Sequence, residues 1–366
     1  MYSRAQPGRF AISLVHGKTQ QETYPLFAMQ HYLAKSEPKL VSQFIYTRRG
    51  QSWMARHARE FDVVHGLQGF HSTVVPCLEA EKHGVPAVVK FALHGVELAE
   101  KPGIRGLLKA TRRRALVAQL SGVIAISQDI VDELLGYGIP EERIARIPNG
   151  VDTTAFAPLA DDAARAALRR ELGWNDRPTI IFVGAISGRK RSHLLVEALG
   201  LLRREGIDCQ LVLAGPEQDT AYSNAMRQRA KTLDIVDRVI WAGFSPHVSP
   251  IYRAGDLFAL PSSSEGLPNA MLEAMASGLP AVGTRISGIV DLIAPGRTGE
   301  LVEAEPASIA SALRGFMTDL PRCRTTGAAA REFILKGYSV EAVLDAHERL
   351  FRAVMAGRPA AEAGMG

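Results

Sequence analysis

Short runs of apolar residues alternate along this chain with longer amphipathic stretches. In the first half, the apolar runs that we expect to form buried strands are 9–15, 40–46, 62–65, 87–90 and 122–126. The amphipathic segments that we expect to form helices are 24–35, 72–83, 104–120 and 129–137. Continuous apolar runs are typical of strands covered on both faces, and their alternation with helices predicts a parallel sheet with right-handed crossovers.

The second half of the chain repeats this rhythm and predicts a second sheet. Its expected strands are 179–184, 210–214, 239–242, 256–260, 279–283 and 299–302. So many strands exceed what one open sheet usually holds, so we predict two α/β domains, at 1–150 and 177–338. Turn residues between Pro148 and Asp152, followed by a short helix that Asp161 or Asp162 can cap, indicate a linker at about 148–177.

Composition and charge exclude several classes of protein. The chain is 46% hydrophobic and 22% charged, which excludes wholesale disorder, and its net charge of +5 is too small to demand nucleic acid. No apolar run approaches the roughly 20 residues of a membrane-spanning helix, and we find no signal peptide. The three cysteines form no CxxC pair and no cluster with histidine, so we expect a reducing, cytoplasmic location.

The segment 256–280, with the sequence DLFALPSSSEGLPNAMLEAMASGLP, carries the strongest chemical signal. A strand is expected to end at Leu260, and a helix to run from about Pro268 to Ser277, because proline is tolerated in a first helical turn. Free amides at the start of such a helix form a ready site for an anion. Those amides belong to Gly266, Leu267 and Asn269.

Two carboxylates accompany this helix start. Glu265 directly precedes the helix, and Glu273 lies one to two turns inside it. Carboxylates beside phosphate-binding amides are suited to accept hydrogen bonds from sugar hydroxyls rather than to contact the phosphate. From the spacing alone, the alternative that both are ordinary solvated carboxylates is about equally favoured.

A second candidate site is the loop 183–191, with the sequence VGAISGRKR, which also lies between a strand and a helix. Gly184 and Gly188 let the backbone turn sharply and approach a ligand. The helix dipole disfavours cations at a helix start, so Arg189 and Lys190 there call for a negative partner such as a diphosphate. The loop is not a Walker A motif, and the alternative is a solvated basic turn.

Several motifs, taken in order, resemble the family 4 retaining glycosyltransferases, also called glycosyl transferases group 1. They are IPNGVD at 147–152, VG…RK at 183–190, LAG at 213–215, WAGF at 241–244 and EGLPNAMLE at 265–273. The last matches the family's E-x7-E motif. The resemblance implies the GT-B fold, in which two Rossmann-like, doubly wound parallel-sheet domains face a deep interdomain cleft. The first domain would bind the acceptor, with a C-terminal helix at about 340–357 packing back on it, and the second would bind the sugar donor.

The resemblance also implies roles for residues of the second domain. Glu273 would bind the ribose hydroxyls of a nucleotide, and Glu265 the hydroxyls of the donor sugar. Arg189 and Lys190 would neutralise the leaving diphosphate, although Ala185 replaces the arginine that family members often carry after the glycine matching Gly184. The remaining donor contacts would be Gly184, Phe244, Gly266, Leu267, Pro268 and Asn269.

The first domain resembles the family less closely. Its first loop contains Gly17 and Lys18, with one glycine where family members usually have two, and is the candidate acceptor or phosphate loop. His94, followed by Gly95, occupies the place of the family's active-site histidine and would help hold the positive charge that develops during transfer. The alternative is a structural histidine at a strand end. The expected catalytic residues are His94, Glu265, Arg189 and Lys190.

The resemblance predicts a hexosyltransferase-type enzyme that uses a nucleotide-diphosphate sugar and retains its anomeric configuration. No Asp-x-Asp motif occurs, so we expect no metal and no other cofactor. The acceptor would be a glycan or a lipid-linked sugar, in surface polysaccharide or glycoconjugate biosynthesis. The alternatives are a sugar-nucleotide 2-epimerase and a non-catalytic homologue that binds a nucleotide sugar.

The segment 104–120 is both basic and amphipathic. This composition suits peripheral contact with an anionic membrane, which would bring the protein to the inner face of the cell membrane. The alternative is a core-packed helix with a solvated basic face.

Overall fold

The computed structural model of the chain describes residues 5–6, 9–10, 39–95, 97 and 104–365. Two compact units divide the chain: the first contains 1–148 and 344–366, and the second contains 149–343. The strand expected at 9–15 is described only at Arg9–Phe10 (β2), which pairs antiparallel with Ala5–Gln6 (β1). The helix expected at 24–35 lies outside the described residues, as does the loop of Gly17 and Lys18.

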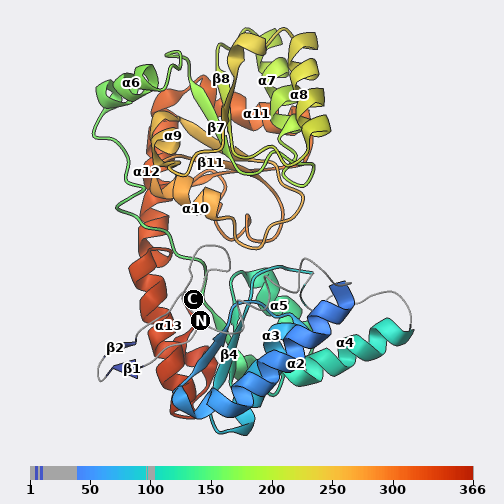
Figure 1. Cartoon of the computed structure of the whole chain (residues 1–366). Helices are drawn as coiled ribbons and strands as arrows, with labels where there is room; N and C mark the ends of the chain where they lie inside the picture. The colour runs from blue at the N-terminus through green and yellow to red at the C-terminus, as the bar shows by residue number, and fades with distance from the viewer. Residues whose placement is uncertain (1–4, 7–8, 11–38, 96, 98–103, 366) are drawn as a thin grey trace. The chain divides into compact units, whose positions relative to one another are not determined.

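The first unit contains a parallel sheet with the strand order β3-β4-β5-β6. Its strands are β3 (Val64–Gly66), β4 (Ala87–Phe91), β5 (Gly122–Ala125) and β6 (Ile144–Arg146). The helices before and between them are α2 (Lys39–His57), α3 (His71–Lys82), α4 (Ile104–Val117) and α5 (Gln128–Gly136). Figure 1 shows α2, α3 and α4 side by side.

The C-terminal residues of the chain complete this first unit. Helix α13 (Val340–Met355) contributes its residues from Leu344 onward, and the short helix η4 (Ala360–Ala363) follows it. The ring of Phe351 on α13 lies 5.5 Å from that of His65 on β3, and a Cβ built on Gly122 in β5 would meet Ala360 and Val354. The C-terminal helices α13 and η4 therefore pack against residues of β3 and β5.

Two expectations for the first unit were wrong. The segment 40–46 is part of helix α2 and not a strand, because its apolar residues Leu40, Val41, Phe44 and Ile45 recur with helical spacing in a long amphipathic segment. The strand β6 was missed, because three residues that include Arg146 give little apolar signal. The other expected strands of this unit, at 62–65, 87–90 and 122–126, are present with ends shifted by one or two residues.

The second unit contains a larger parallel sheet with the strand order β12-β11-β10-β7-β8-β9. Its strands are β7 (Thr179–Val183), β8 (Gln210–Ala214), β9 (Val239–Gly243), β10 (Leu257–Leu260), β11 (Ala281–Thr284) and β12 (Gly299–Val302). Its helices are α6 (Asp162–Glu171), α7 (His193–Arg204), α8 (Thr220–Thr232), α9 (Ser249–Ala254), α10 (Asn269–Ala276), α11 (Pro306–Met317) and α12 (Leu320–Gly337). Figure 1 shows α7, α8 and α11 on one side of this sheet and α9, α10 and α12 on the other.

The order of strands in the second unit contains a switch point. The chain runs from β7 outward through β8 to β9, then returns to place β10 on the opposite side of β7. The loops that leave the carboxyl ends of β7 and β10 consequently diverge to opposite faces of the sheet. In open α/β sheets, ligands bind in the crevice that forms at such a point.

Helix α6 is anchored to the sheet of the second unit by polar contacts. The side chain of Asp161 accepts a hydrogen bond from the amide of Ala164 at 2.8 Å, which confirms the expected helix cap. Near the other end of α6, Arg169 donates to the carboxylate of Asp256 at 2.6 Å in a buried ion pair. Residues 149–177 thus pack as part of the second unit.

Candidate functional site

The candidate site of the second unit forms from the two loops at its switch point. The loop after β7 spans 184–192, and the loop after β10 spans 261–268. The amide and the hydroxyl of Ser263 both donate to the carbonyl oxygen of Arg189, at 2.9 and 3.0 Å. The two predicted sites, recognised separately in the sequence, are therefore one site.

Opposite charges meet where these loops touch. Lys190 Nζ lies 2.6 Å from Glu265 Oε1, and the two side chains are only 12% and 8% exposed. Arg189 Nη1 lies 3.3 Å from the same carboxylate and donates to the carbonyl oxygen of Ser264 at 2.6 Å. Two cations thus stand beside one carboxylate at the carboxyl edge of the sheet, as an anionic ligand with sugar hydroxyls would require.

Close backbone packing shapes the first of these loops. Gly184 has φ 155°, and a Cβ on Gly215, in the LAG motif after β8, would lie 1.9 Å from the carbonyl oxygen of Gly184. Position 215 therefore accepts only glycine without a backbone shift. Arg191 in the same loop has φ 49°, a conformation that few residues other than glycine adopt.

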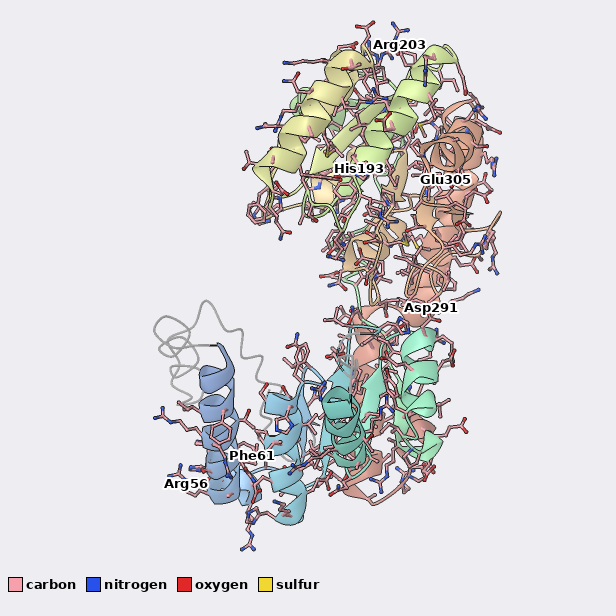
Figure 2. All side chains as sticks on the ribbon, turned by 90° about the vertical axis from the view of Figure 1, so that its right-hand side faces the viewer. Arg56, Phe61, His193, Arg203, Asp291 and Glu305 are labelled. Atoms are coloured by element: carbon pink, nitrogen blue, oxygen red, sulfur yellow. The ribbon has the colours of Figure 1, made fainter. Side chains whose placement is uncertain are left out.

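The loop after β7 leads directly into helix α7. Figure 2 shows His193 at the first turn of this helix and Arg203 near its other end. The backbone N–H of His193 donates to the hydroxyl oxygen of Tyr222 on α8 at 3.1 Å, and its Nδ1 lies 2.8 Å from the same oxygen. Tyr222 thereby fixes the start of α7 behind the basic residues.

The second loop ends at the N-terminus of helix α10. In the part of the chain that the structure describes, no acceptor is bound to the backbone amides of Gly266, Leu267 and Asn269. The side-chain amide of Asn149, in the IPNGVD motif, donates to Asn269 Oδ1 at 2.9 Å and to the carbonyl oxygen of Leu267 at 3.2 Å. These amides lie at the start of a helix, where an anion is favoured, and Asn149 helps to hold the shape of this loop.

Glu273 lies on α10 and is mostly buried. The hydroxyl of Tyr252 on α9 donates to Glu273 Oε2 at 2.8 Å. Burial raises the pKa of the Glu273 carboxyl above its usual range, and the hydrogen bond from Tyr252 opposes that shift. Tyr252 is itself fully buried. The centroid of its ring lies 5.8 Å from that of Phe156 and 6.0 Å from that of Phe258. Sequence reasoning missed Tyr252, because only the packing of α9 on α10 brings it to this carboxylate.

Two further residues expected to contact the sugar donor are Phe244, which lies apart from this cluster, and Pro268, which lies beside it. Phe244 directly follows β9, and its side chain is 72% exposed, at the same carboxyl edge of the sheet but separated from β10 by the positions of β7 and β8. Pro268 precedes α10 and accepts the first hydrogen bonds of that helix, from Met271 and Leu272.

In the first unit, His94 lies in an exposed turn after β4. Its neighbour Gly95 has φ 68°, which favours glycine, and the Gly95 amide donates to Glu133 Oε2 at 3.0 Å. The turn leaves the carboxyl end of a parallel strand, which is where ligand-binding residues gather in α/β sheets.

Helix α4 carries the basic residues considered for membrane contact. Among its described side chains, Arg113 donates to the carbonyl oxygen of Glu97 at 2.7 Å, and the guanidinium of Arg114 stacks 3.9 Å above the ring of Tyr137. These two cations therefore bind the protein itself. No helix among the described residues has the length and apolarity that crossing a membrane requires.

Family comparisons agree with the motif order. The profile of the glycosyl transferases group 1 matches residues 164–333, and that of glycosyltransferase family 4 matches residues 13–155. The chain belongs to the family 4 glycosyltransferases. Its two parallel-sheet units have the architecture of the GT-B fold, which confirms the expected fold class.

Curated relatives of this glycosyltransferase include two enzymes from Mycolicibacterium smegmatis. An alpha-maltose-1-phosphate synthase is 30% identical over 83% of this chain and 82% of its own length. A GDP-mannose-dependent alpha-(1-6)-phosphatidylinositol monomannoside mannosyltransferase is 31% identical over 54% of this chain, which spans about half (53%) of that enzyme.

Solved structures similar to this glycosyltransferase share its fold at low identity. Anabaena Alr3699/HepE in complex with UDP superposes with a TM-score of 0.72 and 21% identity, covering 82% of this chain and 80% of the other. A glycosyltransferase from Rickettsia africae gives a TM-score of 0.74 and 19% identity, covering 85% of this chain and 82% of the other.

Proposed function

We propose that this enzyme transfers a sugar, with retention of configuration, from a nucleotide-diphosphate sugar to a glycan or lipid-linked acceptor. The observation that carries the proposal is the convergence of Arg189, Lys190 and Glu265 with the start of helix α10 at one switch point. The names of the relatives support it: one mannosyltransferase is GDP-mannose-dependent, and the Anabaena protein was crystallised with UDP.

The sugar donor would replace the existing contacts between Glu265 and the cations Lys190 and Arg189 with contacts of its own to each of these groups. Its diphosphate would bind Lys190 and Arg189 together with the free amides at the start of α10. Glu265, released from those cations, would accept hydrogen bonds from the sugar hydroxyls, and Glu273 from the ribose hydroxyls. The ion pair of the free enzyme keeps Lys190 and Glu265 ordered, which lowers the entropic cost of binding.

The chemistry would depend on stabilising charge on both sides of the bond that breaks. Arg189 and Lys190 would neutralise the negative charge that builds on the leaving phosphate, a preorganised electrostatic effect. The phosphate oxygen would then take the proton of the attacking hydroxyl, so no protein nucleophile would be required. His94 would face the positive charge that develops on the sugar.

The phosphate site would need no metal ion, because Arg189, Lys190 and backbone amides supply its positive charge. Activity is therefore expected to survive an excess of EDTA. Complete loss in EDTA, with recovery on adding magnesium or manganese, would contradict this part of the proposal.

The acceptor would be a growing glycan or a lipid-linked sugar used in surface polysaccharide or glycoconjugate synthesis in the cytoplasm. One relative acts on a phosphatidylinositol mannoside, and this name supports a glycolipid acceptor. Peripheral membrane contact would use exposed cations of α4 such as Arg112, since Arg113 is occupied within the protein.

The deciding experiment incubates the enzyme with UDP-glucose or GDP-mannose and a panel of glycan and glycolipid acceptors. Release of nucleoside diphosphate that depends on the acceptor, with proton NMR showing an α-linked product, is expected. A sugar-nucleotide 2-epimerase would instead convert its donor without any acceptor. A non-catalytic homologue would bind the donor and release no nucleotide with any acceptor.

A further inference from the structure

A buried carboxylate lies beneath the turn that carries His94. The side chain of Glu97 is 1% exposed. Its Oε2 accepts hydrogen bonds from the backbone amides of Ala92 at 2.6 Å and Leu93 at 3.0 Å, and its Oε1 accepts one from the amide of Gly69 at 2.8 Å. One carboxylate thus joins the loop after β3 to the turn after β4.

The loop after β3 is pressed against this turn by close packing as well. A Cβ built on Gly69 would lie 2.1 Å from the ring of Phe91, the last residue of β4. A Cβ at position 69 would require the buried ring of Phe91, or the loop itself, to shift. The contact is therefore specific to the residues that make it.

Both neighbours of His94 are held by carboxylates. The amide of Leu93, on one side, donates to Glu97, and the amide of Gly95, on the other, donates to Glu133 Oε2 at 3.0 Å. His94 itself remains exposed. The backbone on each side of an exposed histidine is thus fixed from within the protein, while the imidazole is left available.

Burying a carboxylate costs free energy unless other groups compensate its charge, and several groups do so at Glu97. Burial raises the pKa of Glu97, against the three backbone N–H groups that lower it. The charge of Glu97 raises the pKa of Lys90, while burial of Lys90 lowers it. The guanidinium of Arg113 donates to the carbonyl oxygen of Glu97. Three amides bind the carboxylate of Glu97 and one guanidinium binds its carbonyl oxygen, so this residue is tied to the turn after β4 and to the loop after β3.

We propose that Glu97 is a positioning residue that fixes His94 for sugar transfer, with Glu133 as a second, weaker support. The inference rests on the proposed function, since it assigns His94 to the reaction. It adds to that function a dependence on two carboxylates that would not contact the substrate.

The same unit offers a matched control. Glu81 also accepts three hydrogen bonds, from the amides of Ala87 at 2.8 Å and Ser121 at 2.6 Å and from the hydroxyl of Ser121 at 3.0 Å. Ala87 begins β4 and Ser121 precedes β5, so Glu81 joins loops at the opposite, amino-terminal edge of the sheet. Its loss would disturb folding in a similar way without touching His94.

The first readout is amide hydrogen exchange in the full-length protein, which needs no substrate. A glutamine at position 97 could still accept from Ala92 and Leu93 with its one remaining oxygen, so the exchange is measured in Glu97→Ala, which removes all three hydrogen bonds. We expect faster exchange at Gly69, Ala92 and Leu93 in Glu97→Ala, and at Ala87 and Ser121 alone in Glu81→Ala. Equal exchange at Ala92 and Leu93 in wild type and Glu97→Ala would overturn the proposal.

The second readout is a double-mutant cycle on kcat with the donor and acceptor that give turnover. Glu97→Gln is expected to lower kcat by about 10-fold to 100-fold, the cost of misplacing a reacting group, with little change in KM for the donor. In a His94→Ala background, the same substitution should lower kcat little further, whereas Glu81→Gln should act equally in both backgrounds. Additive effects of Glu97→Gln and His94→Ala would overturn the proposal.

Two further variants keep the test decisive if Glu97→Gln folds poorly. Glu97→Asp keeps the charge and should retain part of kcat. Glu133→Ala removes the acceptor of the Gly95 amide, together with the contact between Glu133 and Tyr137, and should cause a smaller loss. Wild-type kcat in both variants would overturn the positioning role. A wild-type enzyme that protects these amides but turns over no donor would instead contradict the proposed function.

Discussion

The state of Glu273 illustrates how single residues define this site. The sequence indicated a carboxylate for a ribose, and the structure shows that this carboxylate is mostly buried and bound by the hydroxyl of Tyr252. A buried carboxyl is costly to ionise, so the proposed role of Glu273, accepting hydrogen bonds from ribose hydroxyls, would depend on pH. The Tyr252 hydroxyl favours the ionised form and keeps one oxygen in place.

We predict that nucleotide affinity falls as pH drops through the raised pKa of Glu273, because only the carboxylate accepts both ribose hydroxyls. In Tyr252→Phe the pKa of Glu273 should rise further, so the fall should begin at higher pH. Well above the pKa of Glu273 the two proteins should bind with similar affinity, because Tyr252 contacts the carboxylate and not the nucleotide. Calorimetric titration of UDP or GDP across pH measures both effects, and the titration of the nucleotide itself is common to both proteins. Superimposable profiles would show that Tyr252 has no part in setting this carboxylate.

Residue types were predictable from the sequence where a motif fixes their spacing, and not where the fold brings distant residues together. Glu265 and Lys190 were each recognised from local patterns, yet their ion pair joins residues 75 positions apart. Glu97 lies close to Ala92 and Leu93 in sequence, but its third partner, Gly69, comes from another loop. Neither contact leaves a periodic signal in the sequence.

At the scale of elements, the prediction succeeded where strands are buried on both faces. Strand β8, whose residues are all buried, has the expected bounds, Gln210–Ala214. The partly exposed edge strand β12 also has its expected bounds, Gly299–Val302. Helix α2 was read as a strand because a short apolar run has no decisive period when read alone. The strand order, and with it the switch point between β7 and β10, was not predicted, because an apolar pattern does not say which strands are neighbours.

The loop before α10 depends on a glycine in another element. Gly288 has φ 73°, and a Cβ there would lie 1.7 Å from the carbonyl oxygen of Gly266. Gly288→Ala should therefore displace Gly266 and weaken the binding of UDP or GDP by about tenfold or more, the scale of one or two lost hydrogen bonds to a charged group.

Gly296 provides the control for this prediction. It also has a left-handed backbone, with φ 76°, but a Cβ there would meet open space. Gly296→Ala should lower stability by about 1–2 kcal/mol through backbone strain alone and leave nucleotide affinity unchanged. Thermal unfolding and calorimetry of both variants separate these effects, and equal nucleotide affinity in both would count against a role for Gly288 in the site.

At the scale of the whole molecule, the chain returns to its first unit at the C-terminus. The ring of Phe351 on α13 lies 5.5 Å from His65 on β3, and His347 lies 5.8 Å from the same imidazole. Burial lowers the pKa of His65 well below its usual value, and the nearby positive groups His347 and Lys90 lower it further. The last helix thus packs against a histidine that the fold keeps neutral.

We predict a pH dependence of stability from this packing. In the unfolded chain, His65 takes up a proton below about pH 6.5, whereas in the folded protein burial opposes protonation. The free energy of unfolding therefore has its full value above about pH 6.5 and decreases as the pH falls below it. The slope from this residue is at most about 1.4 kcal/mol per pH unit. Urea unfolding of wild type and His65→Leu measures it. The variant should lose this part of the slope and keep the smaller part from His71, whose pKa burial also lowers. An undiminished slope in His65→Leu would assign the effect to other groups.

The central claim is that the second unit binds the nucleotide diphosphate of a sugar donor at its switch point. Calorimetric titration of UDP and GDP, in EDTA, into wild type, Glu273→Ala and Glu300→Ala tests it most directly. Glu300 lies on the edge strand β12, paired with Arg322 at 2.9 Å, and serves as the control. Wild type should bind either UDP or GDP, and Glu300→Ala should bind that same nucleotide with the same affinity as wild type. Glu273→Ala should bind it at least about tenfold more weakly, since two hydrogen bonds to a carboxylate contribute about 1.5–3 kcal/mol each. Equal affinity in all three proteins, or binding of neither nucleotide by wild type, would contradict the claim.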